Sequence, residues 1–152
     1  MIAHLIELSV FSTPEEEAKV YQSLISLIPF DLEKEKLRVE MLNASGFSDR
    51  KIIIMKITLQ KQRHITLFLE NLTKILNEEQ RELLLRQAES RLDKDLYFFL
   101  RLDKNRLIDE GKCWLTDEGN CYHIRLALAP FPRKRENALE LLNQLFSNPK
   151  AI

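Results

Sequence analysis

Residues 96–104 read Leu-Tyr-Phe-Phe-Leu-Arg-Leu-Asp-Lys, and their alternation indicates how this chain builds a sheet. Side chains of a β-strand point alternately to its two faces, so the spacing predicts a strand whose faces differ in character. One face carries the apolar residues Leu96, Phe98, Leu100 and Leu102. The other carries Tyr97, Phe99, Arg101 and Asp103. We expect the first face to build a core and the second to present aromatic rings beside a cation.

A second stretch, residues 122–129, has the same asymmetry. Tyr122, Ile124, Leu126 and Leu128 share one face, which leaves His123 and Arg125 on the other. If the two strands are close in the sheet, Arg125 and His123 join the aromatic face of the first strand on one exposed surface. Unpaired RNA bases stack on aromatic side chains, and arginine contacts phosphates or base edges. This surface therefore favours RNA as a ligand.

Further basic residues surround the two strands. Three of them come just before the last expected helix, where free backbone N–H groups also favour anions. We expect these residues to contact RNA phosphates: Lys104, Arg106, Arg133, Lys134 and Arg135. Each candidate also has a purely structural interpretation. The aromatic rings could pack beneath a helix, Arg101 and Arg125 could pair with Asp103 or with a helix glutamate, and the cations before the last helix could simply be solvated.

Hydrophobic periodicity predicts the other elements. Strands are expected over residues 4–11, 37–42, 51–60 and 112–116, and helices over residues 14–28, 61–76 and 77–92. The segment Thr13-Pro14-Glu15-Glu16 supplies an N-cap, a proline at the first helical position and a capping-box glutamate. Residues 105–111 should form a helical turn, residues 112–116 and 122–129 a hairpin, and the last helix should stop at Asn148-Pro149.

This order of elements is dominated by hairpins. It favours an α+β fold with a single mixed, mostly antiparallel sheet and helices packed on one face. A chain of 152 residues is long enough to bury a core without disulfides or metal, so we expect one domain over residues 1–152.

Composition argues against several kinds of chemistry. Three scattered glycines build neither a phosphate loop nor a dinucleotide fingerprint, and the three histidines share no metal-ligand spacing. We expect no cofactor and no metal. Cys113 and Cys121 could form a cross-strand disulfide, but a reduced pair is favoured because no secretion signal is present. The lack of a long apolar run predicts a cytoplasmic protein without a membrane segment.

Net charge is zero but unevenly distributed. Residues 1–49 hold four basic and nine acidic side chains, whereas residues 50–152 hold nineteen and fourteen. A molecule polarised in this way can attract a polyanion to one side.

Three segments together resemble a known family. They are residues 4–20, the stretch Phe99–Lys104 with Gly111 after it, and Pro132–Glu136. In this order they resemble an archaeal family of small predicted RNA-binding proteins that are also described as exosome subunits. The resemblance implies an α+β fold similar to that of the large-subunit ribosomal protein that binds the smallest ribosomal RNA. Arg101, Asp103 and Lys104 match its strand motif, and residues 133–136 match its basic entry to the last helix. Residues 105–111 depart from the small-residue pattern of the family.

The sequence therefore predicts a non-enzymatic RNA-binding protein. Association with exosome or other RNA-processing proteins follows only from the resemblance. One alternative is a structural or scaffold protein, a homodimer that uses the aromatic sheet face as its interface. Another is an enzyme, which a pocket around Cys121, His123 and an acid would favour.

Overall fold

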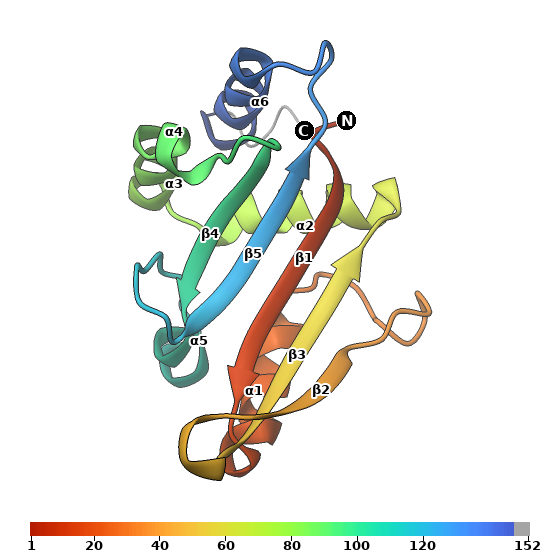
Figure 1. Cartoon of the computed structure of the whole chain (residues 1–152). Coiled ribbons are helices and arrows are strands. Elements are labelled where there is room, and N and C mark those ends of the chain that lie inside the picture. Colours follow the sequence, from red (N-terminus) through yellow and green to blue (C-terminus); the bar gives the residue numbers. More distant parts are fainter. Residues whose placement is uncertain (148–152) are drawn as a thin grey trace.

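The computed structural model describes residues 1–147, which form a five-stranded sheet in the order β2-β3-β1-β5-β4 (Figure 1). All neighbouring strands are antiparallel. The strands are β1 (Ala3–Ser12), β2 (Glu40–Ser45), β3 (Lys51–Leu59), β4 (Tyr97–Asp103) and β5 (Cys121–Leu128). The predicted α+β fold with a single, mostly antiparallel sheet is confirmed.

The helices lie behind the sheet or beyond its ends. In Figure 1, α1 and α2 lie behind the strands, α3 and α4 lie to the left of the upper part of β4, α6 lies above that end, and α5 follows β4 at its lower end. The face of β4, β5, β1 and β3 that points to the viewer carries no helix of the described chain. The helices are α1 (Glu17–Ser26), α2 (Gln62–Ile75), α3 (Glu78–Arg86), α4 (Ala88–Arg91), α5 (Lys104–Glu110) and α6 (Arg135–Ser147), with single 3-10 turns at Pro14–Glu16 and Phe47–Asp49.

The alternation along the strands sorts their side chains between core and solvent. Leu100, Ile124, Leu8 and Ile57 oppose one another in a single row across four strands, and each is at most 1% exposed. Their burial beneath the helices supplies the main free energy of folding, because apolar surface is removed from water. Both alternating stretches therefore place their apolar faces in the core, as predicted.

The predicted hairpin of residues 112–116 with residues 122–129 is wrong. Residues 112–116 form no strand, and Leu115 makes only an isolated bridge to Leu102 of β4. The Asp103 N–H donates to the Trp114 carbonyl at 2.7 Å, and the Thr116 N–H donates to the Arg101 carbonyl at 3.0 Å. The segment therefore follows the outer edge of β4. It cannot pair with β5, because β1 and β4 already occupy both edges of that strand.

Two predicted helices also differ in detail. The helix expected over residues 77–92 is split at Gln87, whose backbone (φ −99°, ψ 7°) separates α3 from α4, and the Asn77 side chain caps its start. The helix expected over residues 14–28 begins with a 3-10 turn, and the Thr13 side chain makes no capping hydrogen bond. The Thr13 side-chain half of the predicted capping box is therefore absent, and the carboxylate of Glu16 binds Lys104.

Three further predictions concern the cysteines, a membrane-spanning helix and the end of the last helix. Cys113 and Cys121 are both free thiols. Within residues 1–147 we find no helix with the length and apolar character needed to span a bilayer. The predicted helix stop at Asn148-Pro149 lies outside the described residues.

Candidate nucleic-acid interface

Four of the predicted RNA-binding residues meet on the side of β4 and β5 that no described helix covers. We call this surface the open face; it comprises Tyr97, Phe99, Arg101, His123 and Arg125. Register pairs Phe99 with Arg125 and Arg101 with His123, so these side chains lie in adjacent rows of one surface. The surface exists because both strands place a polar or aromatic residue at every second position while the intervening residues build the core.

Arg125 is held in place by an aromatic ring and a carboxylate. Its guanidinium carbon lies 4.6 Å from the centre of the Tyr97 ring, and its Nη2 lies 3.4 Å from Glu7 Oε2. The other carboxylate oxygen of Glu7 lies 3.8 Å from Lys56 Nζ. Two cations therefore share one carboxylate. In addition, Arg125 Nε is buried and donates to no protein acceptor among the described residues.

Phe99 and Arg101 are the exposed members of the open face. The Phe99 side chain is 41% exposed, so its ring is accessible for stacking. Arg101 Nη1 donates to the Asp117 carbonyl at 3.1 Å. Asp103 makes no ion pair with Arg101, and its carboxylate accepts from the Arg106 N–H at the start of α5. Arg101 therefore keeps donors directed at solvent.

His123 lies between these cations and β1. Partial burial lowers the pKa of His123, and the positive charge of Arg101 lowers that pKa further. The imidazole ring makes an edge contact with Phe11, with ring centres 6.5 Å apart. His123 is thus a neutral ring at pH 7 that borders the basic part of the open face.

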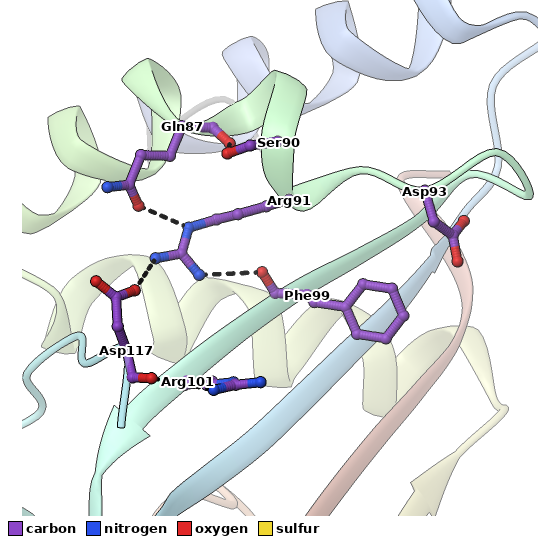
Figure 2. A pocket seen from close by; sticks show the side chains of 7 residues that line it. All are labelled: Gln87, Ser90, Arg91, Asp93, Phe99, Arg101 and Asp117. Atoms are coloured by element: carbon purple, nitrogen blue, oxygen red, sulfur yellow. Dashed lines mark hydrogen bonds and ion pairs between the residues drawn. The ribbon is translucent and has the colours of Figure 1, made fainter. Parts of the chain in front are cut away.

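A hollow of about 390 Å³ lies between α4 and the outer edge of β4 (Figure 2). Arg91 reaches across it from the end of α4, where its Nε donates to Gln87 Oε1 at 2.8 Å and its Nη1 donates to the Phe99 carbonyl at 3.4 Å. Asp117 approaches from the opposite side, with its Oδ1 at 3.7 Å from Arg91 Nη2. The lining residues are Gln87, Ser90, Arg91, Asp93, Phe99, Arg101 and Asp117. The hollow therefore adjoins the open face through Phe99 and Arg101.

The predicted cations before α6 lie near the segment that enters β4. Arg133 donates to the Asp95 carbonyl at 3.0 Å, and Arg135 donates to the Leu92 and Glu89 carbonyls at 3.0 and 2.6 Å. These two side chains anchor the turn between α4 and β4. Lys134 is exposed.

The two remaining candidates lie at the opposite end of β4. Lys104 is only 4% exposed, and its ammonium donates to the Phe11 carbonyl and to Glu16 Oε1, each at 2.8 Å. This burial makes Lys104 a structural cation and removes it from the exposed surface. Arg106 is exposed and lies with its guanidinium carbon 4.8 Å from the centre of the Trp114 ring. The predicted set is therefore divided among three places, of which the open face is the densest.

Sequence reasoning missed two residues that belong with these surfaces. Basic and acidic residues alternate around Arg91 in the sequence, a pattern typical of a solvated helix face, and only the break at Gln87 turns Arg91 towards β4. Phe131 is 96% exposed beside the basic residues that precede α6. Its position between Pro130 and Pro132, where a regular element cannot bury it, was a signal available in the sequence.

The alternative enzymatic site gains no support from the geometry. Cys121 is 3% exposed, and burial raises the pKa of its thiol, which is the reverse of what a nucleophilic thiolate needs. Cys121 and His123 form no hydrogen bond with each other. Across residues 1–147, no group of three or more His, Cys, Asp or Glu side chains is arranged to hold a metal ion.

Comparisons with known proteins identify RNA-binding relatives of this chain. A protein-family model described as RNA binding matches residues 5–128. The RNA-binding protein PAB1135 of Pyrococcus abyssi is 27% identical over 143 residues, which are 93% of this chain and 92% of the relative.

Solved structures share the whole architecture. Protein AF2318 from Archaeoglobus fulgidus superposes with a TM-score of 0.82 at 26% identity, covering 94% of this chain and 99% of that one. Mth689 from Methanothermobacter thermautotrophicus superposes with a TM-score of 0.77 at 25% identity, covering 96% of this chain and 99% of that one. The family match spans most of the chain, so the expected family is confirmed: this chain belongs to the RNA-binding family, whose relatives named here are archaeal.

Proposed function

We propose that this chain binds single-stranded RNA on the open face of β4 and β5, with bases against Phe99 and Tyr97 and phosphates near Arg101 and Arg125. The observation that carries the proposal is the register of these side chains on a sheet face that no helix of residues 1–147 covers. Aromatic rings offer each base a flat apolar surface, and neighbouring arginines offset the charge of the backbone. The membership in an RNA-binding family supports the same ligand.

The basic residues before α6 extend this surface in the proposal. Lys134 supplies a phosphate contact and Phe131 a further stacking platform, because both are exposed. Arg133 and Arg135 hold the supporting turn, and Arg106 contributes a weak contact at the far end of β4. The proposed function is binding without catalysis.

The test is a titration of a fluorescently labelled single-stranded RNA with the protein, followed by fluorescence anisotropy over a series of salt concentrations. We expect affinity to fall steeply with salt, with a slope of about −0.7 in log K against log salt for each phosphate contacted. The substitutions R101A and R125A should each weaken binding by about tenfold, as expected for the loss of a hydrogen bond to a charged group.

The matched control is R38A. Arg38 is an exposed arginine that precedes β2, at the opposite edge of the sheet from β4. The R38A substitution changes the net charge by the same amount as R101A does. A general charge effect would therefore weaken RNA binding equally in the two variants. Equal affinities of R101A and R38A, or no RNA binding by the wild type at low salt, would contradict the proposal.

A second candidate function is a homodimer that covers the other part of the same sheet face. Register places Leu42, Ile54 and Phe11 in one apolar row across β2, β3 and β1, and Leu42 and Phe11 are 54% and 52% exposed. Light scattering coupled to size exclusion measures the mass directly. A dimer that F11E converts to a monomer favours this function, whereas a wild-type monomer rejects it.

Association with exosome or other RNA-processing proteins is a finer proposal, which only the family resemblance supports. It is tested by mixing the purified chain with purified exosome subunits and looking for co-elution on size exclusion. Separate elution at micromolar concentrations would reject it.

A further inference from the structure

The hollow between α4 and β4 places two arginines around a single loop residue. Arg91 Nη2 lies 3.7 Å from Asp117 Oδ1, and Arg101 Nη1 donates to the backbone carbonyl of the same Asp117 at 3.1 Å (Figure 2). The carboxylate therefore lies at the outer rim of a doubly positive site. Arg101 makes no ion pair with a carboxylate among the described residues.

Arg91 is pre-positioned for an anion. Its side chain is only 13% exposed, and Gln87 and the Phe99 carbonyl fix two of its nitrogens. Burial lowers the pKa of Arg91, the nearby charge of Asp117 raises it in part, and the charge of Arg101 lowers it again, so on balance the positive charge is incompletely solvated here. A poorly solvated guanidinium with a fixed orientation gains more from an incoming anion than a mobile surface arginine does.

Asp117 is a weak partner for the guanidinium group of Arg91. Its side chain is 94% exposed, and at 3.7 Å its carboxylate is beyond hydrogen-bond distance of Arg91. Ion pairs of this kind contribute little to stability, so displacement of the carboxylate costs little. A phosphate has the same sign of charge as the carboxylate and offers more acceptor oxygens, so it suits a site with two guanidinium groups.

We propose that Arg91 and Arg101 bind a phosphate group of single-stranded RNA in this hollow, and that Asp117 holds the place of that phosphate when RNA is absent. The proposal rests on the proposed RNA-binding function and adds a defined phosphate subsite to it. Phe99 lines the same hollow and belongs to the open face, so a base that stacks on its ring brings its own phosphate to Arg91. A hollow of about 390 Å³ has room for one nucleotide.

The decisive variant is D117N, which removes the competing charge at an exposed position and leaves the fold intact. Its matched control is E118Q, because Glu118 is the adjacent exposed acid and makes no ion pair with a described residue. We expect D117N to tighten RNA binding by about threefold, as the loss of a weak competing ion pair predicts, and E118Q to change it by much less. R91A should weaken binding by about tenfold, since a buried charged donor is lost.

The double variant R91A/D117N separates a specific site from a general charge effect. If Asp117 acts by occupying Arg91, the gain from D117N disappears in the R91A background. R91Q, which keeps most of the side-chain volume, repeats the test if R91A lowers the melting temperature. The RNA is measured with a 5′-phosphate, with a 3′-phosphate and with neither; a gain restricted to one end assigns the site to a terminal phosphate, and an equal gain assigns it to an internal one.

Equal effects of D117N and E118Q, or a D117N gain that survives in R91A, would overturn this inference. If R125A still weakened binding, the proposed function would stand without the subsite. A wild-type protein that binds no RNA would overturn both.

Discussion

The guanidinium group of Arg125 stacks on the ring of Tyr97, with 4.6 Å between its central carbon and the ring centre. The two residues are diagonal neighbours on adjacent strands, since Tyr97 opposes Ala127 and Arg125 opposes Phe99. This contact fixes the cation of β5 against the aromatic of β4. It also leaves Phe99, 41% exposed, as the freer ring for a base.

Substitutions at Tyr97 test this contact. Y97F keeps the ring and should keep RNA affinity within about twofold, whereas Y97L removes the ring and should weaken binding about three- to fivefold, in line with a cation–π contribution near 1 kcal/mol. Anisotropy titration measures both variants. Equal affinities of Y97F and Y97L would mean that Arg125 needs no aromatic support.

Adjacent phenylalanines on β4 should have opposite phenotypes. Phe98 is fully buried and lies 6.1 Å from the Phe146 ring centre, so F98A should lower the free energy of unfolding by about 3–5 kcal/mol. F99A should change stability by less than about 1 kcal/mol but weaken RNA binding by about fivefold or more, because base stacking is lost. Urea unfolding and anisotropy report the two effects separately. A large loss of stability in F99A would show that its ring packs into the fold.

Substitution of Lys104 should lower the stability of the protein and leave its RNA affinity unchanged. K104M removes the donor to the Phe11 carbonyl and the partner of Glu16, and we expect a loss of about 1–3 kcal/mol in the free energy of unfolding. RNA affinity, measured where the variant is folded, should stay at the wild-type value. A drop in affinity equal to that of R101A would return Lys104 to the binding surface.

The ion pair between Lys104 and Glu16 makes the stability of the protein depend on pH. The hydrogen bond from Lys104 holds the pKa of Glu16 below its ordinary value of 4.5, so the folded state favours the charged carboxylate. This contribution is present above pH 4.5 and is lost as the pH falls through the lowered pKa of the folded state. E16Q should therefore be less stable than the wild type near neutral pH, and the difference should shrink in acid. A difference that stays constant down to pH 3, by thermal unfolding, would contradict this assignment.

Substitutions of the two neighbouring basic residues Lys134 and Arg135 should have different effects. K134A should leave the melting temperature unchanged and reduce the salt slope of RNA binding by about 0.7, because one phosphate contact is lost. R135A should lower the melting temperature, since Arg135 bonds the Glu89 and Leu92 carbonyls that end α4. Scanning calorimetry measures the melting temperature of each variant, and RNA titrations over a salt series measure the slope. Identical behaviour of the two variants would place both side chains in the same role.

Local periodicity determined which side chains face the core. Phe98 and Ile124 could be assigned to the core, and Phe99 and Arg125 to the opposite face, because alternation in a strand depends only on neighbours along the chain. The same reasoning gave the α+β fold class.

Contacts between distant segments were decided only by the tertiary structure. Lys104 is buried because Glu16, 88 residues earlier, lies beside it, and no local pattern encodes that encounter. Residues 112–116 joined β4 instead of β5 because β1 had taken the other edge of β5, which is a competition between distant strands. Arg91 reached the hollow because the helix breaks at Gln87 and packs against β4. Side-chain direction is a local property, whereas the identity of a partner depends on loop closure across the whole chain.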